Sequence, residues 1–458
     1  MAPKSKIILD TDPGVDDVMA LLLALSASPE ELELAMISVT YGNVPLQCCL
    51  RNVAALYHVL EKEFAWRKSQ GRPEGYETLK ANKTIVAAGA EHSLADPVLA
   101  ADYFRMYFPI IDMHVLSMTN ANWGLNNTDG ADGLHNVHDI HTDLSPAETW
   151  KALFDKEDAN DHTSSYPRFT PSKEPAHKEM LRLLRENPAD TISILAVGPL
   201  TNVALAATED PETFLKVKEL VVMGGAIEVP GNVTPSAEFN TYADPLAAAL
   251  VYALSSPNPA STMPPIPSNV LNIKPYPAKL SRRLTVTLCP LDITERHAIN
   301  KNYFVEKVQP YIDAGSPLAR WASHFINGAF NKIDSMEGDG NEPALALHDP
   351  FTVWYVLTRD DPRWKVPAKP EDLRVETVGQ WTKGSYILDK RIRSKPGEAA
   401  LVDLSDDVEA DPHLVTLDEV PGDTMGWLSV RKGNRIRRVI GTPGENTFKE
   451  VWMQRIFG

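Results

Sequence analysis

Four carboxylates lie within eight residues near the start of the chain, in the segment Asp10-Thr11-Asp12-Pro13-Gly14-Val15-Asp16-Asp17. The segment follows an apolar run at residues 6–9, so we expect it at the end of a buried strand. Carboxylates held this close repel one another, which disfavours ionisation of all of them at once. A bound cation relieves that repulsion, and oxygen ligands suit a hard ion such as calcium or magnesium. A helix cap by Asp16 or Asp17 is the simpler interpretation, but it explains only one carboxylate.

A second group of polar side chains lies at residues 231–240, after an apolar run at residues 219–223. Asn232, Glu238 and Asn240 supply two amides and a carboxylate within nine residues. Such groups in one loop can hydrogen-bond the vicinal hydroxyls of a sugar. A turn stabilised by its own side chains explains the same pattern, and this segment taken alone does not separate the two.

The pair His348-Asp349 is the third candidate, placed at the expected start of a helix. The histidine is a titratable acid and the aspartate an oxygen ligand. A single such pair has a structural role more often than a catalytic one, so it gains weight only beside the other two segments.

Short strand signals alternate with helix signals along the chain, which predicts a mostly parallel sheet with helices on both faces. We therefore expect an open, Rossmann-like α/β fold. The expected strands are residues 6–9, 34–40, 84–88, 191–197, 219–223 and 284–288. The expected helices begin at residue 16 and then cover residues 52–64, 178–186, 200–207, 244–254, 350–357 and 447–455.

Three stretches interrupt the alternation, and we expect them to be surface inserts in a single domain spanning residues 1–458. Residues 154–175 are polar, and residues 255–283 are too rich in proline for a regular helix. Residues 403–438 begin acidic and end basic.

The composition limits the function classes. The 458 residues carry 61 acidic and 45 basic side chains, a formal charge of −16, which argues against a nucleic-acid partner. The three cysteines form neither a disulfide framework nor a CxxC pair, so we expect a reducing compartment and a cytoplasmic protein. No signal peptide is visible, and the longest apolar stretch, residues 18–25, is too short to span a membrane.

Together, the three segments resemble the nucleoside hydrolase family of the inosine–uridine-preferring type. The resemblance covers most of the chain, in order. The other matching motifs are Thr40-Tyr41-Gly42-Asn43, Ala196-Val197-Gly198-Pro199-Leu200-Thr201-Asn202, Val222-Met223-Gly224-Gly225, Ala243-Asp244-Pro245 and Pro290-Leu291-Asp292-Ile293-Thr294.

The resemblance implies a calcium-dependent hydrolase that splits a nucleoside into ribose and a free base, with a place in nucleoside salvage. It implies that Asp12 is the general base for a calcium-bound water and that His348 is the general acid for the leaving base. It further implies a homo-oligomer, a dimer or a tetramer. The implied calcium ligands are Asp12, Asp17, Asp349 and the backbone oxygen of Val197. The implied ribose-binding residues are Asp16, Asn43, Asn232, Glu238 and Asn240, with Asp10 supporting the cluster from behind.

One segment departs from the family pattern. Many members carry a histidine before a glycine where Asp129 stands here, which leaves base recognition open. His135 and His138 lie nearby as substitutes. Trp123, Tyr41 and Phe239 could form an aromatic wall for the base, although ordinary packing explains each of them equally well.

Two other functions fit parts of the pattern. A haloacid-dehalogenase-type phosphatase also places an Asp-x-Asp pair after its first strand, but it does not explain the 232–240 segment. A non-catalytic nucleoside or ribosyl binder on the same scaffold would not need the full set of Asp12, Asp17, His348 and Asp349.

Overall fold

The fold is known from a computed structural model, which describes residues 4–95, 130–154, 168–268, 270, 273–277, 279–337, 340–391, 423–429 and 431–458. Asp129 and Trp123 lie outside these ranges. Within them, no helix combines the length and the apolar character that crossing a membrane requires.

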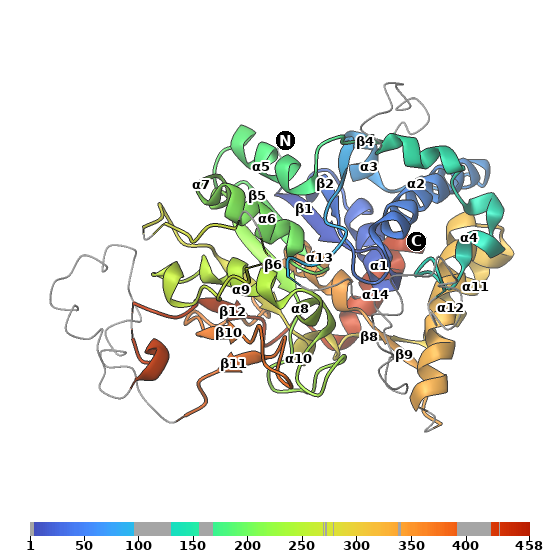
Figure 1. The fold of residues 1–458 in the computed structure, drawn as a ribbon. Helices are drawn as coiled ribbons and strands as arrows, with labels where there is room; N and C mark the ends of the chain where they lie inside the picture. Colours follow the sequence, from blue (N-terminus) through green and yellow to red (C-terminus); the bar gives the residue numbers. More distant parts are fainter. Residues whose placement is uncertain are drawn as a thin grey trace, which may run out of the picture.

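An eight-stranded parallel sheet forms the centre of the molecule, in the order β12-β7-β6-β5-β1-β2-β3-β4 (Figure 1). Its strands are β1 (Ser5–Thr11), β2 (Leu32–Val39), β3 (Thr84–Ala88), β4 (Phe169–Pro171), β5 (Ile192–Ala196), β6 (Glu219–Met223), β7 (Val286–Cys289) and β12 (Ile436–Arg438). Two antiparallel pairs lie outside it, β8 (Ala298–Asn300) with β9 (Ala344–Ala346) and β10 (Leu373–Val375) with β11 (Tyr386–Leu388). The expected fold class is confirmed.

Helices cover both faces of the sheet, as the alternation of strand and helix signals predicted (Figure 1). Because side chains alternate along a strand, Ile7 and Leu9 of β1 join one core and Ile8 joins the other. The first core includes side chains of α1 (Val15–Leu25), α2 (Leu46–Ser69), α11 (Lys301–Asp313), α12 (Pro317–Glu337), α13 (His348–Thr358) and α14 (Glu445–Phe457). The second includes side chains of α5 (Ala176–Glu186), α6 (Thr201–Glu209) and α9 (Pro245–Ala253). The shorter helices are α3 (Glu77–Ala81), α4 (Val137–Ile140), α7 (Pro211–Phe214), α8 (Phe239–Ala243) and α10 (Leu291–Thr294).

The strand order indicates where in the sheet a ligand site is expected. β1 has β2 on one side and β5 on the other, so the chain order reverses at β1. In open parallel sheets, ligands bind at the carboxyl ends of the strands beside such a switch point. The segment after β1 carries Asp12, and the residue after β5 is Val197, so both belong to this crevice.

Two of the expected inserts each contribute a short edge strand to the sheet. Residues 154–175 contain β4, which pairs with β3, and residues 403–438 contain β12, which pairs with β7. Both strands are three residues long and lie at the sheet edges, so their sequences are too short to show a strand pattern. Of residues 255–283, the described part contains one short 3-10 turn at Pro259–Ser261 and packs Tyr276 into the second core.

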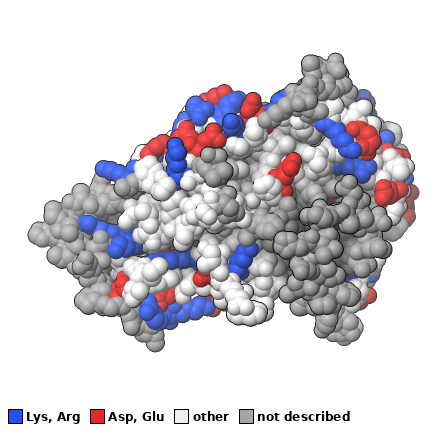
Figure 2. Space-filling view, in the orientation of Figure 1, with Lys and Arg blue, Asp and Glu red and all other residues white. Residues whose placement is uncertain are grey.

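Charged side chains of both signs are interspersed on the described surface in Figure 2. Several form exposed pairs, such as Arg182 with Glu186 at 2.6 Å. Such pairs add little to stability, so the two cores carry most of the folding free energy.

Candidate functional site

The carboxylate turn, which we define as residues 10–17, joins β1 to α1 through a dense set of hydrogen bonds to Asp17. Its Oδ1 accepts from the hydroxyl of Thr11 at 2.5 Å and from the backbone N–H of Asp12 at 3.1 Å. Its Oδ2 accepts from the N–H of Gly14 at 3.2 Å and from Nδ2 of Asn43 at 2.8 Å. Asp17 therefore does cap α1, as the simpler interpretation predicted for one of the pair.

The two carboxylate oxygens of Asp12 differ in their hydrogen bonding. Its Oδ2 accepts from the backbone N–H of Asn43 at 2.6 Å, whereas its Oδ1 is buried and has no hydrogen-bond partner among the described residues. Burial and the neighbouring Asp17 raise the pKa of the Asp12 carboxyl well above its usual value. Gly198 packs against this carboxylate so closely that an added Cβ would lie 2.4 Å from Oδ1. A buried acceptor without a donor is costly, which favours a ligand at this atom.

Asp16, Asp17 and Asp349 form the carboxylate group of the site. One side-chain oxygen from each lies within 4.8 Å of the other two. Burial and mutual repulsion raise the pKa of Asp16 to about 7 and that of Asp349 well above its usual value. The sequence placed Asp12 in the metal set and Asp16 at the ribose, whereas this group contains Asp16 and does not contain Asp12.

Val197 extends the ladder between β1 and β5, because its N–H donates to the carbonyl of Asp10 at 2.8 Å. Its own carbonyl accepts from Nδ2 of Asn240 at 2.7 Å. A carbonyl has a second lone pair, so this bond leaves Val197 able to contact a cation.

Asp10, the first residue of the turn, is buried and is hydrogen-bonded to polar side chains of two other segments. Its Oδ1 accepts from the hydroxyl of Ser38 and from Nδ2 of Asn202, the latter at 3.0 Å. Burial raises the pKa of Asp10 to about 7.

The loop at residues 231–240 uses most of its polar groups internally. Glu238 is buried and caps α8, its oxygens accepting from the N–H groups of Gly225 at 2.7 Å, Asn240 at 2.6 Å and Thr241 at 3.0 Å. Asn232 is exposed, and its Oδ1 accepts from the N–H of Phe239 at 2.9 Å. Of the three ribose contacts predicted in this loop, Asn240 is therefore the one whose side chain bonds to Val197 in the crevice.

His348 begins α13 directly before Asp349. Its Nδ1 lies 2.8 Å from Oγ1 of Thr294, which fixes the ring and leaves Nε2 as the nitrogen for another partner. Burial lowers the pKa of His348 to about 4, so the ring is neutral at pH 7.

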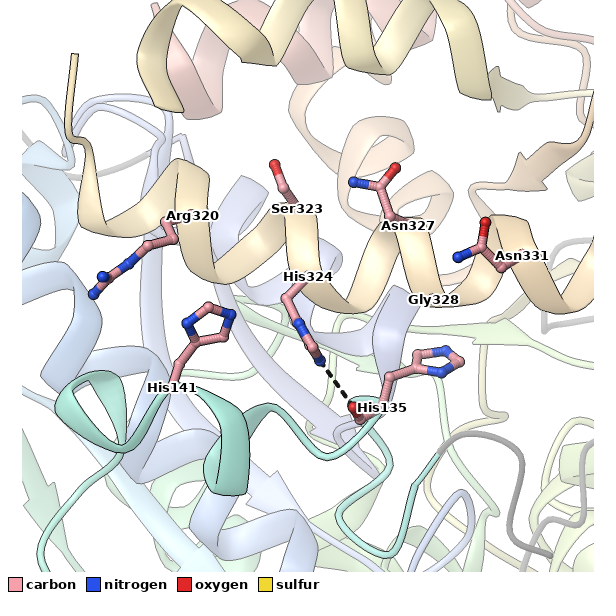
Figure 3. Close-up of a pocket in the computed structure, with 8 residues that line it drawn as sticks. All are labelled: His135, His141, Arg320, Ser323, His324, Asn327, Gly328 and Asn331. Carbon is pink, nitrogen blue, oxygen red and sulfur yellow. Dashed lines mark hydrogen bonds between the residues drawn. The ribbon is translucent and has the colours of Figure 1, made fainter. Parts of the chain in front are cut away.

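His135 and His138, suggested as replacements for the family histidine at the position of Asp129, lie in two different environments. His138 is buried, with Nε2 at 2.8 Å from Oδ1 of Asn52. His135 lines a cavity of about 430 Å³ between its own loop and α12, where its carbonyl lies 2.8 Å from Nε2 of His324 (Figure 3). Tyr41 and Phe239 are both buried.

Sequence reasoning missed four supporting residues, each of which holds a candidate residue in place. Thr11 and Thr294 bond to Asp17 and His348, and Asn202 bonds to Asp10. Asn52 bonds to the carbonyl of Pro13 at 2.7 Å. A polar residue among apolar helix residues, as at Asn52, is the one signal that could have pointed to it.

A family profile, curated relatives and solved structures all match this chain to nucleoside hydrolases. A profile of the inosine-uridine preferring nucleoside hydrolases matches residues 7–412. The chain is 28% identical to the pyrimidine-specific ribonucleoside hydrolase RihA of Salmonella paratyphi B, over 87% of this chain and 93% of the relative. It is 25% identical to the non-specific ribonucleoside hydrolase RihC of Klebsiella pneumoniae, over 88% and 94%. The solved purine-preferring ribonucleoside hydrolase from Gardnerella vaginalis has the same fold, with a TM-score of 0.59, 20% identity and coverage of 99% and 98%.

Proposed function

The chain belongs to the family of inosine-uridine preferring nucleoside hydrolases, and on this premise we propose how its own residues cleave the N-glycosidic bond of a ribonucleoside. The products are ribose and a free base. The single observation that carries the proposal is the buried Oδ1 of Asp12, without a partner among the described residues, beside the carboxylates of Asp16, Asp17 and Asp349.

The donor set fits a hard cation. Carboxylates crowded together with raised pKa values are stabilised by a positive charge, and their oxygens are the ligands that calcium prefers. We propose Asp12, Asp17, Asp349 and the carbonyl of Val197 as the calcium ligands. Bound calcium supplies positive charge that orients a water molecule and lowers its pKa.

Asp12 would be the base for the attacking water at Oδ1, its oxygen without a donor among the described residues, while the N–H of Asn43 holds Oδ2. Asp16 is half-buried, whereas Asp17 and Asp349 are buried, so its carboxylate is the one best placed to accept from a ribose hydroxyl. Asn240 has its Oδ1 left to accept from a ribose hydroxyl, since its Nδ2 donates to the carbonyl of Val197. We assign Asn43, Asn232 and Glu238 to holding this surface in shape, because the hydrogen bonds of their side chains are made within the protein.

Bond cleavage builds positive charge on the ribose, and surrounding carboxylates stabilise that charge. The departing base takes up a negative charge or a proton. His348 is proposed to donate the proton from Nε2, with Thr294 holding Nδ1. The ring is neutral at pH 7 in the ion-free protein, so this role requires its pKa to rise in the substrate complex.

Release of free ribose tests the proposal. The purified chain is incubated with uridine, inosine, cytidine, adenosine or guanosine, with and without a calcium chelator. Chelator-sensitive release supports the proposal, and the ranking of the bases gives the specificity. A folded, calcium-loaded protein that binds nucleoside and returns it intact would instead establish the non-catalytic binder. The phosphatase alternative does not fit the family match.

A further inference from the structure

Asn52 of α2 connects two segments that are far apart in the sequence. Its side chain is fully buried, and Nδ2 donates to the carbonyl of Pro13 at 2.7 Å and to the carbonyl of Asp132 at 2.8 Å. Its Oδ1 lies 2.8 Å from Nε2 of His138. Both hydrogens of the amide are therefore used, and so is its oxygen.

These contacts fix the orientation of the amide and the protonation of His138. A flipped amide would point its oxygen at two carbonyl oxygens, so Oδ1 must face His138. His138 then carries its proton on Nε2, and Nδ1 is the unprotonated nitrogen, 3.2 Å from Oγ of Ser145. Burial lowers the pKa of His138 to about 4, so the ring is neutral at pH 7 and keeps this arrangement.

The segment on the far side of Asn52, which we call the Asp132 loop (residues 130–138), is held as one unit. Oδ1 of Asp132 accepts from the N–H groups of Leu134 and Asn136, both at 2.8 Å, and Oδ2 accepts from the N–H of His138 at 3.2 Å. His135 and Asn136 both have positive φ, at 57° and 60°. Such strained backbone persists only where its surroundings hold it, so the contacts of Asp132 and Asn52 determine the shape of the loop.

The segment on the near side is the carboxylate turn. Pro13 lies between Asp12 and Asp17, and the next residue, Gly14, donates its N–H to Oδ2 of Asp17. A displacement of the Pro13 carbonyl therefore moves the backbone that carries both carboxylates. We propose that Asn52 is a positioning residue that couples the Asp132 loop to the carboxylate turn, so that cation binding at the turn and the order of the loop depend on each other. The cation half of this inference rests on the proposed function.

Calcium titration tests whether changes at Asn52 and His138 alter cation binding at the carboxylate turn. Calorimetry with calcium alone is run on chelator-treated wild type, Asn52→Ala, His138→Leu and the double variant. We expect Asn52→Ala to weaken calcium binding by about tenfold and His138→Leu, which touches no carboxylate of the turn, by about fivefold, within the usual range of coupling between sites. The double variant should be no weaker than Asn52→Ala alone, because both changes break one connection. His138→Gln, which restores a side-chain N–H donor, should recover most of the affinity.

Asn434→Ala is the matched control. Asn434 is also buried, and its Nδ2 donates to the carbonyl of Leu373 at 2.7 Å while its Oδ1 accepts from Thr262 at 2.6 Å. It should lower the melting temperature without changing calcium affinity. Equal losses of affinity in Asn434→Ala and His138→Leu would mean that general destabilisation is the cause, and would overturn the coupling.

Hydrogen exchange separates the inference from the proposed function. In chelator, Asn52→Ala should speed exchange of the Asp12 and Gly14 amides and of the Leu134, Asn136 and His138 amides. Unchanged exchange at Asp12 and Gly14 would overturn the inference. If wild type binds no calcium but Asn52→Ala still speeds exchange at both segments, the proposed cation is refuted and Asn52 remains the link between the two segments.

Discussion

The carboxylate turn and the loop at residues 231–240 both follow a strand and both carry several polar side chains, but their polar atoms are used in opposite ways. In the loop, the carboxylate of Glu238 receives backbone N–H groups from Gly225, Asn240 and Thr241. In the turn, Oδ1 of Asp12 receives no donor from the described residues, and Asp16 lies beside two further carboxylates.

The difference shows how a binding site is distinguished from a structural cap. A carboxylate surrounded by N–H donors is stabilised within the protein and contributes to folding. Carboxylates that face one another with raised pKa values are destabilised until a cation or proton arrives. The carboxylates of the turn thus lower the stability of the ion-free protein and favour cation binding, whereas Glu238 mainly stabilises the fold of its own loop.

The largest expected effect comes from Asp12→Asn. The amide keeps an oxygen for the N–H of Asn43 but cannot take a proton from water, so kcat should fall by at least about 10³-fold. The melting temperature should stay within a few degrees of wild type or rise, because an unpaired buried carboxylate is removed. Free-ribose assays and thermal melts measure both, and retention of a tenth of the activity would disprove the general-base role.

His348→Ala should reduce kcat with natural nucleosides by about 10²-fold. A nitrophenyl riboside has a leaving group that needs no proton, so its cleavage should change by less than about fivefold. The comparison is made on the same enzyme preparation. An equal loss with both substrates would show that His348 does not act as an acid.

Glu238→Gln tests the loop directly. Replacing one oxygen by an NH₂ group sets a donor against backbone donors, so the free energy of unfolding should fall by about 2 kcal/mol. Because Glu238 is placed as a cap, kcat should fall less than in Asp12→Asn. Urea unfolding and ribose release are measured together, and a stable but inactive variant would move Glu238 into the catalytic group.

The pH dependence of stability follows from Asp10. Its folded pKa of about 7 lies above the unfolded value of 3.8, so folding favours its protonated form. The stability it contributes is present below pH 3.8 and is lost as the pH rises to about 7. In chelator, Asp10→Asn should therefore be more stable than wild type at pH 7.5, by up to about 4 kcal/mol, and this advantage should disappear near pH 4. An unchanged difference between the two pH values would contradict the shift.

Asn232→Ala should have the smallest effect. Its side chain is exposed and supports one N–H group, so the loss of stability should be about 1 kcal/mol. The KM for nucleosides should rise only a few-fold. A loss of more than about 100-fold in kcat/KM would show that Asn232 contacts the ribose in the transition state.

The sequence predicted the parallel sheet because its central strands are apolar runs about five residues long, as at residues 84–88 and 219–223. It did not predict β4 or β12, because three residues at a sheet edge carry too little periodicity. It located the turn, since four carboxylates after a strand are unusual. It could not show that both oxygens of Asp17 accept hydrogen bonds while Oδ1 of Asp12 has no donor among the described residues. Both residues accept from Asn43, which only folding brings beside them.

The most direct test of the contrast between the two regions is calcium calorimetry on chelator-treated wild type, Asp17→Asn, Asp349→Asn and Glu238→Gln. The account predicts one calcium site per chain in wild type, its loss in Asp17→Asn and Asp349→Asn, and its retention in a folded Glu238→Gln. Absence of calcium binding in wild type, or equal loss in Glu238→Gln without unfolding, would contradict it.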